Sequence, residues 1–159
     1  MFLSIFATLG VSRVAYGQDE NIWYKMQKAQ RLARKNNKKI IIYAGANWCI
    51  YCQKMDEEVF PKKAVIDSLD TYFYGVKVDV DSQAPIIFNG KTVSQNHFAR
   101  EHHVRSTPTF IFLNSDGTVI GNQPGYMPAK TFSRLLGYIG SEAYKKMEFG
   151  TYLTNRSKK

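Results

Sequence analysis

The sequence predicts an α/β fold in which a central mixed β-sheet is flanked by helices. Two observations carry this prediction. Stretches with helical spacing alternate with short apolar, β-branched stretches along most of the chain. The last two short stretches are separated only by Ser115-Asp116-Gly117, which is a turn signal. Strands joined through helices run parallel and strands joined by a tight turn run antiparallel, so we expect a mixed sheet.

The N-terminal half is expected to hold a helix, a buried strand and a second helix. Asp19 or Asn21 is a candidate cap for the first helix, which Asn36-Asn37 is expected to end. Lys39 to Ala44 is apolar and β-branched, which is typical of a central strand. Helical spacing returns from Cys49 to about Val59.

The remaining elements continue this alternation. A small hairpin insert is expected around Asn89-Gly90, a strong type I′ turn signal. Pro128 suits the first turn of the last main helix. The expected set comprises helices over 64–69, 94–102 and 128–139, strands over 72–80, 109–113 and 118–122, the hairpin over 86–93 and a C-terminal helical extension over 141–152.

Length, composition and charge restrict the classes of function. A chain of 159 residues, of which 44% are hydrophobic, is long enough for one packed core. Residues 18–159 contain no repeat or low-complexity tract and are expected to form one domain. The formal net charge of +9 fits a solubilised basic surface, an acidic partner or an anionic membrane surface. Nucleic acid is not an expected partner, because no binding motif accompanies the charge.

The first 17 residues have the pattern of a secretory signal peptide. Phe2 to Val11 is mostly apolar but too short to span a bilayer. Ala15 and Gly17 are small residues at the positions that precede a cleavage site before Gln18. The segment before the apolar run is atypical, because it lacks Lys and Arg. We therefore expect a protein that is periplasmic or otherwise exported.

The two cysteines of the chain lie three positions apart, at Cys49 and Cys52. They follow an apolar strand pattern and begin a helical one, a placement that favours a reversible disulfide. The N-terminus of a helix stabilises a thiolate, which is the nucleophile in thiol–disulfide exchange. The thiols carry this chemistry themselves, so the redox-active disulfide needs no metal or organic cofactor.

The surroundings of this pair resemble the thioredoxin superfamily over Ile22 to Ile139. Trp48 precedes the first cysteine, Thr107-Pro108 heads the third strand and Asp116-Gly117 follows it. Two kinds of exported protein share further residues. Segments 46–49 and 54–60 look like the C-terminal domain of periplasmic thiol:disulfide interchange proteins, whereas segments 105–110 and 125–126 look like thioredoxin-like proteins of sulfur-oxidation gene clusters.

The resemblance implies roles for residues at the site. Cys49 would be the exposed attacking thiol, and Cys52 would resolve the mixed disulfide. Pro108 would be cis and would place Thr107 beside the disulfide, where its backbone pairs with an extended substrate. The wall of the substrate site would comprise Trp48, Ile50, Tyr51, Thr107 and Pro108.

The chain departs from the superfamily at one position. Many thioredoxins carry a buried acid six residues before the first cysteine, where this chain has Tyr43. Lys77 occupies the place of that acid's lysine partner and is expected to lack an acid. Tyr43 and Lys77 are therefore the candidate proton-handling residues.

The resemblance implies a thiol:disulfide oxidoreductase that acts on protein disulfides, with reduction favoured over oxidation or isomerisation by analogy. Its electron donor would be a membrane-embedded protein of the thiol:disulfide interchange type. One alternative is a binding module or chaperone with a merely structural disulfide. A zinc site is a second alternative, but two cysteines leave it two ligands short, which His97, His102 or His103 would have to supply.

Overall fold

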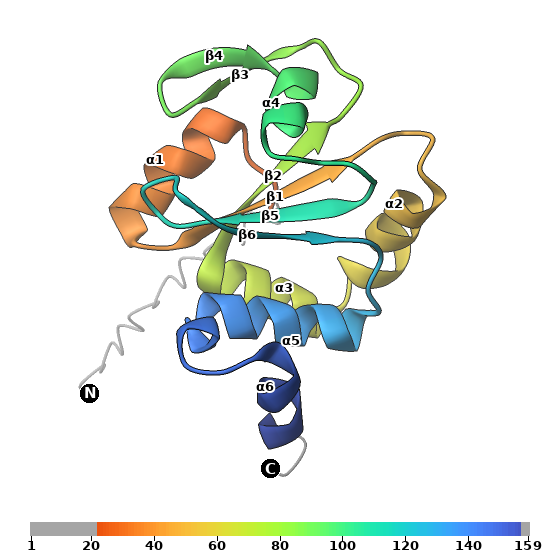
Figure 1. Ribbon diagram of the computed structural model, residues 1–159, viewed down its shortest axis with the longest axis vertical. Helices are drawn as coiled ribbons and strands as arrows, with labels where there is room; N and C mark the ends of the chain where they lie inside the picture. Colours follow the sequence, from red (N-terminus) through yellow and green to blue (C-terminus); the bar gives the residue numbers. More distant parts are fainter. Residues whose placement is uncertain (1–21, 157–159) are drawn as a thin grey trace, which may run out of the picture.

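The computed structural model describes residues 22–156 and contains the predicted mixed sheet (Figure 1). Strand β1 runs parallel to β2 and antiparallel to β5, which in turn is antiparallel to β6. The expected signal peptide at residues 1–17 lies outside the described residues. The strands of the main sheet, in spatial order, are β2 (Phe73–Asp79), β1 (Lys39–Gly45), β5 (Thr109–Leu113) and β6 (Val119–Pro124).

Helices cover both faces of this sheet (Figure 1). Helices α3 and α5 lie side by side on one face, and α1 and α4 lie on the other. None of the helices in the described part is long and apolar enough to cross a membrane. The helices are α1 (Met26–Asn36), α2 (Ile50–Lys54), the π-helix η1 (Met55–Val59), α3 (Lys63–Tyr72), α4 (Gln95–Glu101), α5 (Ala129–Gly140), the 3₁₀-helix η2 (Ala143–Lys145) and α6 (Phe149–Arg156).

Strand β1 is buried on both faces, which explains its continuous apolar sequence. Ile41 and Tyr43 pack into a core with Phe132 of α5, whereas Ile40 and Ile42 join a second core on the side of α1. Successive side chains of a strand alternate between the two faces, so one strand contributes to both cores. This central position fixes the loop that follows β1.

Helix α1 begins later than predicted. Trp23 instead forms a parallel bridge with Gly75 of β2, supported by a hydrogen bond of 2.8 Å from the Tyr24 N–H to the Gly75 carbonyl. A Cβ at Gly75 would lie 2.6 Å from the Ile22 carbonyl oxygen, so this close approach requires glycine. The prediction that Asp19 or Asn21 caps α1 was therefore wrong: the chain first extends along the sheet edge.

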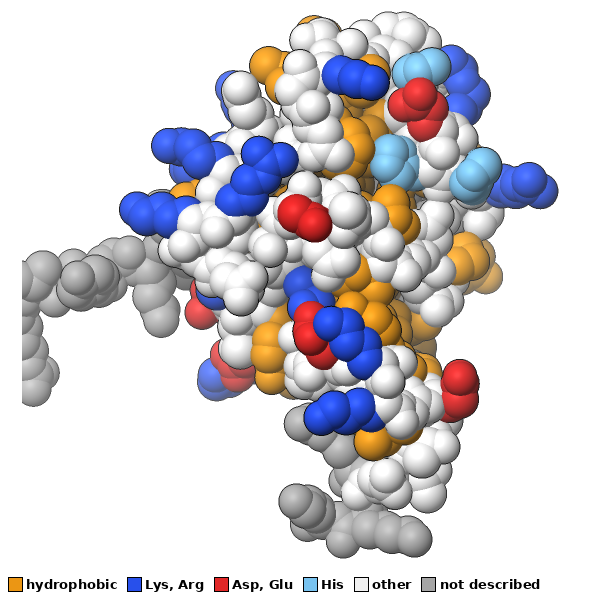
Figure 2. Space-filling model, turned by 60° about the vertical axis from the view of Figure 1, so that its left-hand side comes forward, with side chains coloured by type: hydrophobic (Ala, Val, Ile, Leu, Met, Phe, Trp, Pro, Cys, Tyr) orange, Lys and Arg blue, Asp and Glu red, His pale blue; other side chains and the backbone are white. Residues whose placement is uncertain are grey.

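Helix α1 presents an exposed basic side to solvent. Lys28, Arg31 and Lys35 are exposed, whereas Ala29 and Ala33 are buried against the sheet. Figure 2, which brings the α1 side of the molecule forward, shows Lys and Arg side chains standing out from the surface. The exposed side of α1 thus carries part of the positive net charge of the chain.

The hairpin insert and the C-terminal extension were both predicted. Strands β3 (Pro85–Phe88) and β4 (Lys91–Ser94) are joined by Asn89-Gly90, whose φ angles of 48° and 79° are those of a type I′ turn. Helix α6 packs on α5 through Tyr152 and Tyr138, whose ring centroids are 5.2 Å apart.

Candidate active site

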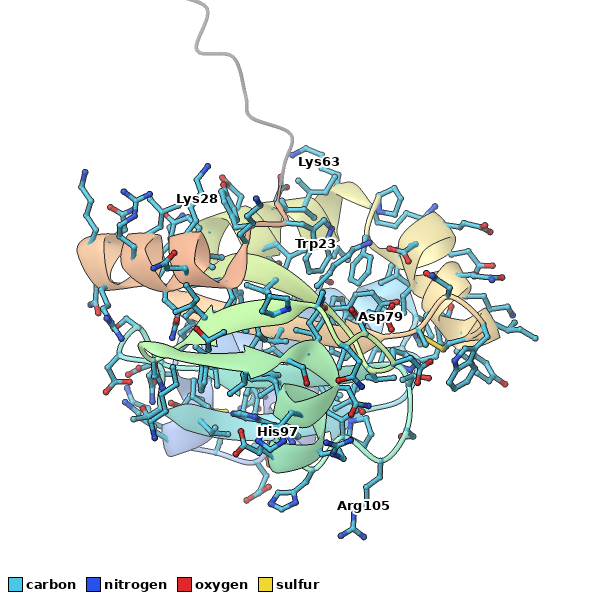
Figure 3. All side chains as sticks on the ribbon, turned by 90° about the horizontal axis from the view of Figure 1, so that it is seen from above. Trp23, Lys28, Lys63, Asp79, His97 and Arg105 are labelled. Carbon is cyan, nitrogen blue, oxygen red and sulfur yellow. A yellow bond between two sulfur atoms is a disulfide. The ribbon has the colours of Figure 1, made fainter. Side chains whose placement is uncertain are left out.

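The two cysteines form a disulfide at the start of α2, which follows β1 after a short loop (Figure 3). Cys49 is the N-cap residue of α2, and its Sγ accepts a hydrogen bond of 3.1 Å from the Cys52 N–H. An N–H directed at this sulfur favours the thiolate after reduction. The expectation that Cys49 is exposed was wrong for the disulfide form. Each cysteine is only 4% exposed in this disulfide.

The front of the site is an exposed apolar rim around Cys49. Trp48 and Ile50 are each 68% exposed, and Tyr51 is 57% exposed. These three belong to the six large hydrophobic side chains that are exposed among the described residues, so half of that set lies within four positions. The Trp48 Nε1–H donates to Asp81 Oδ2 over 2.6 Å. An apolar patch of this kind is typical of a protein contact surface.

The Thr107-Pro108 segment lies at the same end of the sheet. Its peptide bond is cis, the geometry that the resemblance implies. Thr109 pairs with Ala44 near the end of β1, so the preceding Thr107 and Pro108 lie toward the loop that leads to Cys49. Pro108 is buried, and its carbonyl oxygen accepts a hydrogen bond from the Gly125 N–H. The sheet register thus brings this segment and the disulfide to the same end of the central strands.

The back of the site is a cavity beside Cys52 that several polar and charged side chains help to line. It has a volume of about 230 Å³. Gly45 forms part of its wall, and a Cβ there would lie 3.3 Å from both the Cys52 Sγ and the Tyr43 ring. Tyr43 and Cys52 can therefore share this space because residue 45 is glycine. The cavity is lined by Tyr43, Gly45, Ala46, Asn47, Cys52, Asp56, Lys77, Val78, Asp79 and Gln95; Figure 3 labels Asp79, on the end of β2 near the disulfide.

Tyr43 faces this cavity as a hydrogen-bond donor. Its hydroxyl donates to the Cys52 carbonyl oxygen over 3.1 Å. Burial, and secondarily the negative charge of Asp56, raises the pKa of the Tyr43 hydroxyl above its ordinary value. Tyr43 is therefore protonated at neutral pH and cannot serve as a base.

Lys77 has an acid partner, contrary to the prediction that its acid is missing. Its Nζ lies 2.5 Å from Asp56 Oδ1, which reaches it from η1. The ammonium also lies over the rings of Trp23, Tyr43 and Phe60, with centroid distances of 5.1, 5.6 and 5.9 Å. The prediction failed because it considered only the position of Tyr43. One signal in the sequence could have placed Asp56 near this site. The spacing of Cys52 and Asp56 puts both residues on one side of a helix.

The described residues contain no cluster of three or more His, Cys, Asp or Glu side chains that would hold a metal ion. Two of the three histidines have other contacts. The His102 ring stacks on Phe98 with centroids 4.0 Å apart, and His97 Nε2 lies 3.2 Å from Glu101 Oε1. His103 has a positive φ of 55° after α4.

Known proteins resemble this chain in sequence and in fold. The thiol:disulfide interchange protein DsbD of Pseudoalteromonas atlantica is 27% identical over 109 residues, which cover 65% of this chain and 17% of that protein. The chain thus matches about a sixth of that relative's length.

Two solved structures show the same fold. A thioredoxin-fold protein from Helicobacter pylori has a TM-score of 0.69 and 21% identity, covering 87% of this chain and 90% of its own. The oxidised C-terminal domain of DsbD from Neisseria meningitidis has a TM-score of 0.54 and 19% identity, covering 70% and 90%. The resemblance to DsbD C-terminal domains is therefore present, although distant.

The family model for the thioredoxin-like domain matches residues 26–140. This range runs from the start of α1 to the end of α5 and includes both cysteines. The sheet order, the helices on both faces and the disulfide at the start of α2 are all part of the matched range. The chain belongs to the thioredoxin-like domain family.

Proposed function

We propose that the protein is a thiol–disulfide oxidoreductase that acts on protein disulfides outside the cytoplasm, chiefly as a reductase. The observation that carries this proposal is the Cys49–Cys52 disulfide at a helix N-terminus, beneath a rim of exposed apolar side chains. The disulfide supplies a reversible two-electron couple, and the rim supplies a surface for a protein substrate.

The reaction has two steps, and both are exchanges at sulfur. In the first, the Cys49 thiolate attacks one sulfur of the substrate disulfide, and the other substrate sulfur leaves with the electron pair and takes up a proton. In the second, Cys52 loses its proton and attacks the Cys49 sulfur. The Cys49–Cys52 bond forms as the substrate thiolate departs, so the substrate is reduced and the dithiol is oxidised. We assign Trp48, Ile50, Tyr51, Thr107 and Pro108 to the substrate contact.

The proposed direction of electron flow rests on similarity, and the proposed location rests on a sequence pattern. The distant match to DsbD supports a thiol:disulfide interchange context, with a membrane-embedded protein that reduces the oxidised Cys49–Cys52 pair again. The signal-peptide pattern of residues 1–17 supports export. The relation to sulfur-oxidation clusters remains a prediction from segments 105–110 and 125–126.

The test is the reduction of a protein disulfide such as insulin by the reduced protein. Wild-type protein is expected to turn over with dithiothreitol as the electron source, and Cys49→Ser is expected to have no activity above background. Full activity of Cys49→Ser would overturn the proposal. Equilibration of the pair with glutathione then gives the direction. A potential near about −270 mV supports a reductase, and one near about −120 mV identifies an oxidase.

The exposed rim also favours a second candidate, a binding module whose disulfide is only structural. This alternative predicts binding of unfolded clients by wild type and by Cys49→Ser alike. It further predicts that wild type has no exchange activity and loses stability when the disulfide is reduced. Insulin turnover and client binding, measured on the same two proteins, separate the two functions.

A further inference from the structure

We propose that the exposed basic side of α1 binds the surface of a membrane that contains anionic lipids. The inference goes beyond the proposed function, because it concerns where the folded protein is held and not the reaction at the disulfide. The basic side consists of Lys28, Arg31 and Lys35. These residues are three and four positions apart, a spacing that places side chains on one face of a helix. The buried Ala29 and Ala33 lie on the other face, against the sheet.

This basic side is part of a segment with a large excess of positive charge. Residues 22–39 include seven Lys and Arg residues and no Asp or Glu. Two of the seven have partners in the fold, because Lys38 Nζ contacts the Asp70 carbonyl oxygen and Lys39 pairs with Glu142. The other five are exposed, on α1 or at its N-cap: Lys25, Lys28, Arg31, Arg34 and Lys35.

The exposed cations of α1 form no ion pair with any described residue. Other helices differ in this respect, because Lys63 of α3 lies 2.8 Å from Asp67. Arg31 instead has Lys28 three positions before it and Lys35 four positions after it. Like charges at these spacings destabilise a helix. The arrangement is therefore unfavourable for α1 alone and becomes favourable when an anionic surface supplies the opposite charge.

Two of these cations also oppose the helix dipole. The N-terminus of a helix carries a partial positive charge, so its first turn favours acidic residues over Lys and Arg. Lys25 is the N-cap of α1, and Lys28 lies in its first turn, which contains no acidic residue. The stability of α1 therefore does not explain these two lysines, whereas attraction to an external anionic surface does.

The composition of the basic side favours lipid over a protein partner. Protein interfaces are enriched in aromatic residues, Met and Arg and depleted in Lys. All six large hydrophobic side chains that are exposed in the described part of the chain lie outside α1. A row of Lys and Arg on a helix is instead typical of binding to anionic headgroups. The apolar side of α1 is buried in the core, so α1 binds by charge and does not insert into the bilayer.

Binding through α1 leaves the disulfide accessible. Helices α1 and α2 lie on opposite sides of the molecule in Figure 1, and Figure 3 separates α1 from the disulfide in the same way. A molecule held at the membrane by α1 therefore keeps the rim of Trp48, Ile50 and Tyr51 exposed to protein partners. It is also held close to an electron donor that is embedded in the membrane.

The test is cosedimentation of the full-length protein with vesicles of phosphatidylcholine, either alone or with about 30% phosphatidylglycerol. Neutral vesicles measure any binding by the apolar stretch Phe2 to Val11, because they offer no opposite charge. Wild type is expected to bind the anionic vesicles at least about tenfold more tightly in about 0.1 M salt, and to lose this preference in about 0.5 M salt. Equal binding to both kinds of vesicle would overturn the inference in favour of a solvated surface or an acidic protein partner.

The variant Lys28→Gln/Arg31→Gln/Lys35→Gln removes the three charges of the basic side and introduces residues that favour helices. Its urea-unfolding midpoint is expected to stay near that of wild type, because all three positions are exposed. Its binding to anionic vesicles is expected to be about 10- to 100-fold weaker. Binding as tight as that of wild type would overturn the inference.

The matched control is Arg105→Gln/Lys130→Gln/Lys146→Gln, which removes three exposed cations from other parts of the fold. Figure 3 shows Arg105 and Lys28 at opposite edges of the molecule. The control is expected to bind anionic vesicles within about threefold of wild type, because salt screens charges far from the contact. Equal losses in the two triple variants would show that net charge governs binding, and would overturn a role for the basic side of α1.

Lys28→Glu separates membrane binding from the stability of the helix. It places an acid in the first turn of α1, three positions before Arg31, so the urea-unfolding midpoint is expected to equal or exceed that of wild type. The same change reverses one charge of the basic side and is expected to weaken binding to anionic vesicles about tenfold. Unchanged or tighter binding by Lys28→Glu would contradict the inference.

Discussion

The two sides of the disulfide differ in composition and in origin. The front is a run of neighbours in sequence, Trp48, Ile50 and Tyr51, which are 57–68% exposed. The back is a cavity built from side chains that are distant in sequence, among them Tyr43 and Lys77. A short motif can thus provide a contact surface by itself, whereas the environment of the resolving thiol depends on the whole sheet.

The difference extends to the kind of change that each side tolerates. A surface rim loses a contact when a side chain is removed, but the core remains intact. The back wall is close-packed against the sulfur, and Gly45 leaves its neighbours only 3.3 Å from where a Cβ would be. Substitutions at the back are therefore expected to change stability and chemistry together, and those at the front to change substrate binding alone.

The largest expected effect comes from removing the sulfur of Cys52, which leaves Cys49 as the single thiol. Cys52→Ser leaves Cys49 able to attack a substrate but removes the thiol that releases it, so mixed disulfides accumulate. Insulin turnover is expected to fall by about 10³-fold, which corresponds to about 4 kcal/mol of activation free energy. Non-reducing gels measure the trapped adducts, and the Cys49→Ser/Cys52→Ser double variant, which should trap none, is the control. Undiminished turnover by Cys52→Ser would mean that Cys52 is not the resolving thiol.

The next effect tests the packing of the back wall. Gly45→Val adds atoms beyond a Cβ position that already lies 3.3 Å from the Cys52 Sγ and the Tyr43 ring. Overpacking of this kind is expected to destabilise the oxidised protein by about 2 kcal/mol, measured by urea unfolding. Gly121→Val in β6 is the matched control, because no atom of the described residues lies within 4 Å of its Cβ position. Equal stability changes in both variants would show that the Gly45 wall is not tightly packed.

A smaller effect is expected for the Tyr43 hydroxyl. Tyr43→Phe keeps the ring and removes the bond to the Cys52 carbonyl oxygen, at a cost of about 1 kcal/mol at pH 7. The folded pKa of Tyr43 is raised above the unfolded value of 10.0, so its contribution is present below pH 10 and lost as pH rises beyond it. The stability difference between wild type and variant should therefore shrink above pH 10. A difference that is constant from pH 8 to 11 would contradict the raised pKa.

Most of the fold could be predicted because it is encoded locally. Strand β5 matches the predicted strand over 109–113, the Asn89-Gly90 turn lies where its sequence signal places it, and α4 falls within the predicted helix over 94–102. The start of α1 could not be predicted from local signals, because it depends on the Trp23 bridge to Gly75 across the sheet edge. The π-helix η1 could not be predicted either, because its sequence has the spacing of an ordinary helix.

The candidate site divides in the same way. The cysteines and the exposed rim follow from one contiguous motif, and the cis bond before Pro108 agrees with the resemblance. The Asp56 partner of Lys77 did not follow, because the contact joins residues 21 positions apart on different elements.

The smallest effect on stability is expected at the front. Trp48 is 68% exposed, so Trp48→Ala should change the free energy of unfolding by less than about 0.5 kcal/mol. The KM for a protein substrate should nevertheless rise about fivefold, the loss of about 1 kcal/mol of contact. The rate at which Cys49 of the reduced protein attacks a small disulfide such as DTNB should stay the same, because a small disulfide does not reach the rim. Asp81→Asn, which only weakens the hydrogen bond to the Trp48 indole, should act in the same direction and less strongly. If Trp48→Ala instead slowed the small-disulfide reaction as much as the protein reaction, Trp48 would act on the sulfur itself, and the division between a contact surface in front and a chemical environment behind would not hold.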